Sequence, residues 1–213
     1  MLNENQVIQL RDSLENLGYC QINDYFSPDL LNFLSIASEI TNLNSYHDIA
    51  RIIKSPEGKP TPHIQYAPII GETLLASLTP LYSQITGKNL VPTYSYWRHY
   101  KKQSQLIPHR DRLACQYSCT IQINKSEEKD WPIKINSLSN EIFEQEVPLG
   151  DVILYKGVEV LHWRDPLEYD WSDHIFLHWV DGDDEKYKSE IFDGRSGIGI
   201  PKEQNSSQVF LEE

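Results

Sequence analysis

Two histidines and one aspartate in this chain have the types and the spacing needed to bind a metal ion. His109 and Asp111 lie two residues apart in the segment Pro108-His109-Arg110-Asp111. On an extended segment, residues two apart project from the same face, so this imidazole and this carboxylate can converge on one ion. A second imidazole from a distant strand, that of His162, would complete a two-histidine, one-carboxylate facial set. That set is typical of non-haem Fe(II) sites with open coordination positions.

The surroundings of His162 support its role as the third ligand. It follows the turn signal Gly150-Asp151, the aliphatic run Val152 to Tyr155 and a bend at Gly157. A His-x-Asp pair alone occurs by chance in many proteins, but the ordered set of pair, aliphatic strand and distal histidine is more specific. The alternative interpretation is that His109 and Asp111 form a surface turn and His162 is a packed core histidine.

Helices are predicted before the first metal ligand. Apolar residues at spacings of three and four predict an amphipathic helix from about Asn5 to Leu17, which Gly18 ends as a C-cap. A short strand at residues 19–22 and a second helix, opened by Ser27-Pro28 and running through Ile40, are expected next. The proline-containing segment 41–67 is predicted to be mostly loop, with a short helix at 47–53, and a helix is expected at 69–85.

From Leu90 onward, short β-type runs broken by turn residues predict a sandwich or barrel. The runs are 94–100, 115–124, 131–135, 151–155, 158–164 and 174–180. We therefore expect one domain over residues 1–213, with a helical N-terminal part at 1–89 and a β core at 90–180. The tail beyond Asp181 (181–213) is expected to be a surface extension.

The ordered ligand set resembles the Fe(II)/2-oxoglutarate-dependent oxygenase superfamily. The resemblance covers roughly Leu90 to Val180, and the helical beginning is similar to that of the phytanoyl- and prolyl-hydroxylase-like members. It implies an α+β, mainly β fold: a double-stranded β-helix (jelly roll, cupin-like) with N-terminal helices packed on the core. It also implies Fe(II), the co-substrate 2-oxoglutarate and O2, and hydroxylation of a small polar metabolite or amino acid with release of succinate and CO2. Related halogenases carry a small residue at the carboxylate position, so Asp111 favours hydroxylation or desaturation.

The sequence departs from this family at the co-substrate anchor. Many relatives hold the distal carboxylate of 2-oxoglutarate with a basic residue about ten positions after the distal histidine, where this chain has Ser172-Asp173-His174. Arg164 shares the face of His162 on a strand, and a guanidinium suits a carboxylate, so Arg164 is our first candidate. A structural ion pair of Arg164 with Asp165 or Glu168 is the alternative. Lys125 is the second candidate and His174 the third.

Aromatic residues alternate along the strand that precedes the metal motif. Tyr94, Tyr96, Arg98 and Tyr100 share one face and could line a pocket, with Tyr94 assigned to the co-substrate and the other three to the substrate. Alternatively they are ordinary core aromatics, and the opposite face, with Trp97 and His99, is the buried one. The sequence places His178 and Trp179 at the end of a strand, where we do not expect them to complete a metal triad.

Composition narrows the classes of partner. A formal net charge of -12 without an arginine or lysine stripe argues against nucleic-acid binding and against adhesion to an anionic membrane. The few basic residues that cluster in sequence suit small anions better: Arg98, Lys101, Lys102, Arg110 and Arg112.

The 3 cysteines lack CxxC spacing, so reduced thiols are expected. No signal peptide or run of about 18 apolar residues is visible, so we expect a cytoplasmic protein with a small-molecule substrate.

Two other function classes fit the same residues. One is a cupin-like module that keeps the fold, and even a metal, but binds a small ligand without turnover. The missing anchor at the usual position favours it. The other is a different metal-dependent enzyme on a jelly roll, such as an isomerase or a dioxygenase that needs no 2-oxoglutarate.

Overall fold

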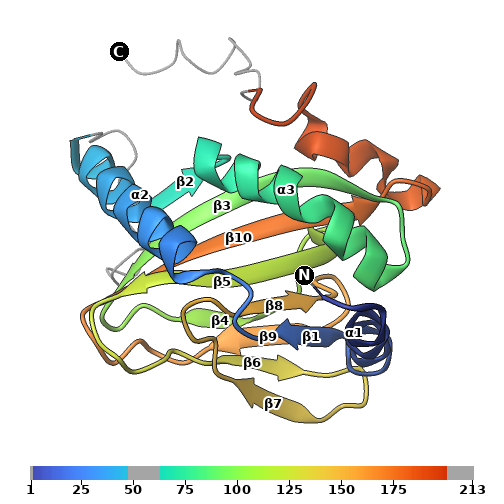
Figure 1. The fold of residues 1–213 in the computed structure, drawn as a ribbon, viewed down its shortest axis with the longest axis horizontal. Helices are drawn as coiled ribbons and strands as arrows, with labels where there is room; N and C mark the ends of the chain where they lie inside the picture. The colour runs from blue at the N-terminus through green and yellow to red at the C-terminus, as the bar shows by residue number, and fades with distance from the viewer. Residues whose placement is uncertain (1, 48–62, 201–213) are drawn as a thin grey trace, which may run out of the picture.

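The computed structural model describes residues 2–47 and 63–200, and their strands form two sheets (Figure 1). The larger sheet has six strands in the order β1-β8-β5-β10-β3-β2, and the smaller has four in the order β4-β9-β6-β7. The bounds of the larger sheet are β1 Tyr19–Ile22, β8 Val152–Tyr155, β5 Tyr117–Lys125, β10 Trp171–Asp181, β3 Leu90–Lys101 and β2 His63–Tyr66. Those of the smaller are β4 Leu106–His109, β9 Leu161–Arg164, β6 Ile133–Asn136 and β7 Ile142–Gln145.

Neighbouring strands in both sheets run antiparallel, and the chain alternates between the sheets. Strands β3, β5, β8 and β10 belong to the larger sheet, while β4, β6, β7 and β9 belong to the smaller. This alternation is the double-stranded β-helix that the sequence predicted. It places β4 beside β9, with His109 directly opposite His162 in the register, although the two residues are far apart in sequence.

The helices cover the larger sheet and its edge (Figure 1). Helix α1 (Glu4–Leu17) starts with a capping box between Asn3 and Gln6 and ends at Gly18, whose φ of 83° is left-handed. Helices α2 (Pro28–His47) and α3 (Ile69–Thr86) lie across the outer face of the larger sheet. The helices therefore close that face, and the space between the two sheets remains for a site.

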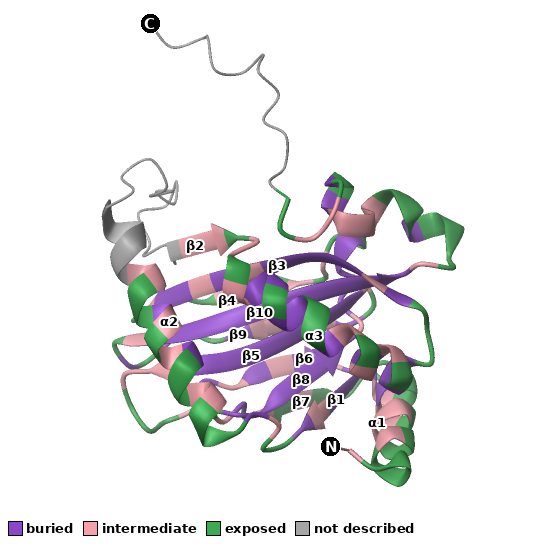
Figure 2. Ribbon diagram, turned by 45° about the horizontal axis from the view of Figure 1, so that its top comes forward, coloured by how far each residue is buried: buried purple, intermediate pink, exposed green. Residues whose placement is uncertain are grey.

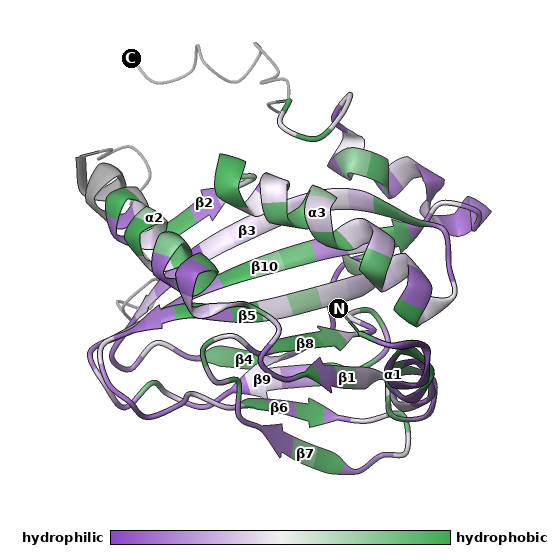
Figure 3. Cartoon of the chain, viewed as in Figure 1, coloured by the Kyte–Doolittle hydropathy of each residue, from purple (hydrophilic) through white to green (hydrophobic). Residues whose placement is uncertain are grey.

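Apolar residues are buried on both sides of the larger sheet (Figure 2). On the helical side, Leu75 and Tyr82 pack with Ile121 and Ile175 in one cluster. Between the sheets, a second cluster contains Ile133 and other side chains, among them Ile135, Val147, Ile153 and Tyr155. Burial on both faces explains the nearly continuous burial of β5, β8 and β10 and their hydrophobic stretches (Figure 3).

The structure corrects some sequence predictions at the ends and edges of the β core. Strands β2, β4 and β7 were not predicted, and α2 extends to His47 rather than stopping at Ile40. The predicted helix at 47–53 lies, beyond His47, outside the described residues. The tail is not a simple surface extension, because Asp193 and Arg195 are buried. Arg195 Nη2 lies 3.0 Å from Glu72 Oε2 in α3, and it donates to the Thr93 carbonyl of β3 at 2.8 Å.

Two further predictions concern the cysteines and the membrane. Cys20, Cys115 and Cys119 are free and buried, as expected. No helix in the described part of the chain is both long and apolar enough to span a bilayer.

Candidate metal centre and its cavity

The three predicted metal ligands converge at the end of the smaller sheet. Nε2 of His109 lies 3.5 Å from Asp111 Oδ1, and Nε2 of His162 lies 3.6 Å from the same oxygen. One ligand atom from each residue falls within 4.8 Å of the others. Facial ligands at about 2.1 Å from a common ion would be about 3 Å apart, so small side-chain shifts suffice to bind one. The two imidazoles come from paired strands, and Asp111 lies two residues beyond the end of β4.

Backbone carbonyls orient both imidazoles for coordination. His109 Nδ1 lies 2.8 Å from the carbonyl oxygen of Ile107, and His162 Nδ1 lies 3.1 Å from that of Val160. A carbonyl only accepts hydrogen bonds, so each Nδ1 carries a proton and each Nε2 is the atom that can face a metal ion. The donor set therefore presents two imidazole Nε2 atoms and one carboxylate to the same point.

Electrostatics give the ligands suitable protonation states. Burial alone would raise the pKa of Asp111, but its hydrogen bond with His109 and the neighbouring imidazoles of His162 and His178 lower that pKa to about 2. Burial lowers the pKa of His162, which is 1% exposed, so this imidazole is neutral at neutral pH. The hydrogen bond with Asp111 raises the pKa of His109. A bound cation would displace that proton.

The Asp111 carboxylate is held by a tight backbone approach and by Ser118. Asp111 N–H donates to the Gly157 carbonyl at 2.9 Å, and Ser118 Oγ donates to Asp111 Oδ2 at 2.8 Å. A Cβ at Gly157 would lie 2.4 Å from Asp111 Oδ2, so only glycine fits there. Ser118 Oγ also lies 3.0 Å from Nδ1 of His178, which lines the same cavity. His178 is thus part of the site although it is not in the ligand set.

A second possible ligand group, Asp111, Cys115 and His178, shares the carboxylate. Burial raises the pKa of the Cys115 thiol, and its sulfur lies 3.2 Å from the hydroxyl of Tyr94. A protonated thiol is a poor ligand, because thiolate is the form that binds metals. The set with two histidines therefore fits a metal ion better.

The ligands open into a cavity of about 300 Å³ between the sheets. Aromatic rings and two guanidinium groups form most of its wall. The lining residues are Tyr66, Tyr94, Tyr96, Arg98, Leu106, His109, Asp111, Arg112, Tyr155, His162, Phe176 and His178. The predicted tyrosine face of β3 thus points toward the metal centre, while the opposite face, with Trp97 and His99, is also buried, under the helices.

The β3 residues reach the cavity to different extents. Tyr94, Tyr96 and Arg98 line it, whereas Tyr100 is 1% exposed and belongs to a buried cluster with Trp131 and Phe176. The Tyr100 hydroxyl accepts a hydrogen bond from Arg98 Nη1 at 3.2 Å. Tyr100 therefore supports Arg98 and does not line the cavity itself.

Arg164 lies between the two sheets, 1% exposed, and is not among the cavity-lining residues. The alternative ion pairs are absent from the described contacts, since Lys134 pairs with Asp165 at 2.6 Å and Lys129 pairs with Glu168. Arg164 donates instead to the Trp131 carbonyl and, at 3.4 Å, to Thr120 Oγ1, and its Nε has no acceptor among the described residues. Burial lowers its pKa to about 10, so it stays cationic at neutral pH.

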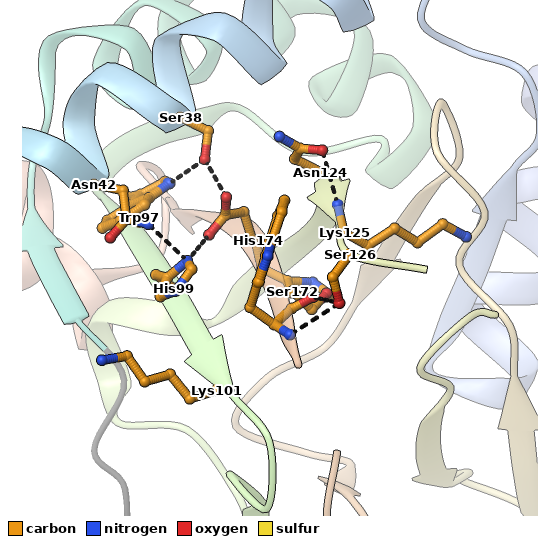
Figure 4. Close-up of polar contacts among 12 residues, drawn as sticks. Ser38, Asn42, Trp97, His99, Lys101, Asn124, Lys125, Ser126, Ser172 and His174 are labelled. Carbon is orange, nitrogen blue, oxygen red and sulfur yellow. Dashed lines mark hydrogen bonds and ion pairs between the residues drawn. The ribbon is translucent and has the colours of Figure 1, made fainter. Parts of the chain in front are cut away.

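The other two anchor candidates differ in position and charge (Figure 4). Lys125 extends away from His174, and its Nζ lies 2.6 Å from Asp130 Oδ1. His174 is buried, with Nε2 at 2.9 Å from Ser172 Oγ. Burial and the nearby Arg164 charge lower the pKa of His174 well below its usual value, so it is neutral. Asp173, between Ser172 and His174, faces the helical side of the sheet. Its carboxylate lies 2.5 Å from Ser38 Oγ of α2 and 2.6 Å from His99 Nδ1 of β3.

Several cavity residues were missed in the sequence. His174, Phe176 and His178 lie two residues apart along β10 and therefore share one face, so this spacing could have identified Phe176 and His178. Arg112 comes one residue after Asp111, so the two-residue spacing of the ligand pair does not mark it; the sequence showed it only as a member of a cluster of basic residues. Tyr66 lies in a segment predicted to be loop, and no local pattern marks it. Its ring stacks on Tyr94 with centroids 5.3 Å apart, a contact that depends on the pairing of β2 with β3.

The structure is similar to those of known 2OG-Fe(II) oxygenases. An oxidoreductase of the 2OG-Fe(II) oxygenase family from Burkholderia pseudomallei matches with a TM-score of 0.64 at 14% identity, over 85% of this chain and 93% of that one. A Pseudomonas putida prolyl-4-hydroxylase matches with a TM-score of 0.58 at 14% identity, over 81% and 98%. The epimerase SnoN from nogalamycin biosynthesis, in complex with Fe3+, alpha ketoglutarate and nogalamycin RO, matches with a TM-score of 0.64 at 8% identity, over 84% and 85%.

The sequence itself matches no protein-family model and no curated protein. The likeness in structure shows that the chain has the fold of the 2OG-Fe(II) oxygenases. The candidate ligand set lies in this fold at the point where the two sheets meet the cavity.

Proposed function

We propose that this protein is an Fe(II)- and 2-oxoglutarate-dependent oxygenase that hydroxylates a small polar metabolite or amino acid, with release of succinate and CO2. The observation that carries the proposal is the convergence of His109, Asp111 and His162 in a fold of this class, with both Nε2 atoms free for a metal. Fe(II) with 2-oxoglutarate and O2 would supply the oxidising chemistry, while the protein supplies binding and orientation.

The second part of the proposal assigns Arg164 to the distal carboxylate of 2-oxoglutarate. A buried guanidinium with no carboxylate within ion-pair distance among the described residues is costly, and an anionic co-substrate would compensate it. Arg164 lies two residues beyond His162 on the same face of β9, which places their Cα atoms about 7 Å apart. An extended five-carbon dicarboxylate is long enough to span that distance.

The cavity wall would bind the substrate through Tyr96 and Arg98, with Tyr100 fixing the guanidinium from behind. The ring of Tyr94 contributes to the wall, and its hydroxyl lies 3.2 Å from Cys115 Sγ. The aromatic lining would exclude water from the reacting carbon, which limits side reactions.

The direct test measures iron and succinate. We expect one Fe(II) per chain in the reconstituted protein, and its loss in His109→Ala, Asp111→Ala and His162→Ala. His174→Gln, which alters a buried imidazole outside the ligand set, is the control and should retain iron. We also expect slow formation of succinate from 2-oxoglutarate without added substrate. Stoichiometric iron in the His109→Ala/His162→Ala double variant refutes the site, and iron binding without any succinate favours a binding module.

A further inference from the structure

Two arginines line the cavity, and they differ in how their charge is compensated. Arg112 Nη1 lies 2.7 Å from Asp193 Oδ1, a carboxylate supplied by the C-terminal segment and only 6% exposed. The same carboxylate accepts a hydrogen bond from the Tyr66 hydroxyl at 2.5 Å. The Arg112 charge is therefore neutralised by an aspartate that is itself firmly held.

Arg98 has no such partner. No carboxylate lies within ion-pair distance of it among the described residues, and its one hydrogen bond in that part of the chain goes from Nη1 to the Tyr100 hydroxyl at 3.2 Å. Its Nε is buried without an acceptor there. The guanidinium carbon lies 4.9 Å from the ring centroid of Tyr96 and 5.7 Å from that of Phe176. These rings fix the guanidinium against the cavity but provide no negative charge.

A fixed, largely desolvated cation on the wall of a cavity favours an anionic ligand. Aromatic contacts compensate only part of the cost of removing a guanidinium from water. An arginine whose planar group is held by rings loses little entropy on binding a carboxylate, so Arg98 is preorganised for that group. Its neighbours Tyr96 and Phe176 offer apolar surface to the remainder of such a ligand.

The charges of the site, taken with the proposed function, leave one position for an anion. The two ligand imidazoles are neutral when coordinated, and Arg112 is paired with Asp193. Fe(II), Arg164 and Arg98 would then contribute four positive charges against three negative ones from Asp111 and 2-oxoglutarate. One positive charge is left over, and it is on the arginine that faces the cavity.

We propose that Arg98 binds the carboxylate of a singly anionic substrate, whose apolar part packs on Tyr96 and Phe176. The proposal rests on the proposed function and narrows the substrate class to carboxylic acids with an adjacent hydrophobic or aromatic portion. Arg112 is not assigned this role, because its guanidinium is already paired with the carboxylate of Asp193.

The test compares benzoate with benzamide, which have the same shape and differ in charge. The protein is loaded with Zn(II), as a redox-inert ion, and 2-oxoglutarate, and the dissociation constants are measured by calorimetry and checked by thermal shift. We expect benzoate to bind about 10- to 100-fold more tightly than benzamide, because its bonds to Arg98 are charge-assisted. Arg98→Met should abolish that preference, and Arg98→Lys should restore part of it.

Arg110→Met is the matched control, because Arg110 lies beside the metal ligands, is exposed and does not line the cavity. It should keep the wild-type preference for benzoate. Equal binding of the two probes, binding of neither, or a preference that survives Arg98→Met would overturn the proposal. Binding of 2-oxoglutarate is measured first in each variant. If the wild type fails to bind it, the proposed function itself fails. If Arg98→Met loses it while Arg164→Met does not, Arg98 is the co-substrate anchor, and both the assignment of Arg164 to 2-oxoglutarate and the assignment of Arg98 to the substrate are wrong.

Discussion

Replacing Arg164 by methionine tests the co-substrate assignment with little change in packing. Methionine keeps an unbranched apolar chain in the barrel but removes the charge and all the donors. The guanidinium of Arg164 has no carboxylate partner among the described residues, so the variant breaks no known ion pair. Removing one partner of a buried ion pair costs about 3–5 kcal/mol. We therefore expect the protein without ligands to lose much less stability than that.

The effect on 2-oxoglutarate should be large by comparison. Charge-assisted hydrogen bonds contribute about 1.5–3 kcal/mol, which corresponds to an affinity loss of about 10- to 100-fold. At a concentration of 100 Kd, the co-substrate stabilises the wild type by about 2.7 kcal/mol. The variant at the same concentration would keep only about 0.4–1.4 kcal/mol. For a chain of this size, the missing part corresponds to a Tm shift smaller by about 3–9 °C.

Thermal unfolding in the presence of Zn(II), with and without 2-oxoglutarate, measures both the stability of the protein without co-substrate and the increase in Tm that 2-oxoglutarate produces. Lys125→Met is the matched control, since Lys125 is paired with Asp130 and should not contribute to co-substrate binding. Metal content should be the same in all three proteins. A normal 2-oxoglutarate shift in Arg164→Met, or a reduced one in Lys125→Met, would refute the assignment. A fall in stability of 3–5 kcal/mol without ligand would show that Arg164 is chiefly structural.

Three other outcomes are expected around the metal centre. Gly157→Ala should abolish iron binding in a folded protein, because the new Cβ would lie 2.4 Å from Asp111 Oδ2; wild-type iron content with an unchanged circular dichroism spectrum would contradict this. Ser118→Ala should weaken iron binding by about 10- to 100-fold, since it removes the hydroxyl that orients the Asp111 carboxylate. A metal-competition titration measures the affinity, and an unchanged value would contradict this role of Ser118. The pKa of Asp111 is lowered from 3.8 to about 2, so its stabilisation of the metal-free protein is present above pH 4 and is lost as the pH falls toward 2. Asp111→Asn should flatten the pH–stability curve below pH 4, as measured by denaturant unfolding. An unaltered slope would contradict the lowered pKa of Asp111.

The sequence by itself predicted the candidate ligand set and much of the β core. Residues two apart on an extended segment project from the same face, so the spacing of His109 and Asp111 indicated that they could bind one ion. The aliphatic run before His162 indicated a buried strand. The alternation of Tyr94, Tyr96 and Arg98 was readable for the same reason. Strands β2, β4 and β7 were missed, because they are short and lie at sheet edges or beside turns, where local patterns are weak.

Only the tertiary structure decided which basic residues remain without an acidic partner. Arg164, Lys125 and Arg112 all have basic side chains. Local sequence cannot show that Asp130 neutralises Lys125, or that Asp193, 81 positions away, contacts Arg112. Nor could it show that Asp165, the neighbour of Arg164, pairs instead with Lys134 of β6. Ion pairing depends on which strands and loops meet in space, and that is set by strand pairing and by the docking of the C-terminal segment. The candidate metal ligands could be found from the sequence because two of them lie close together in it, whereas the charge balance of the cavity depends on contacts between distant segments.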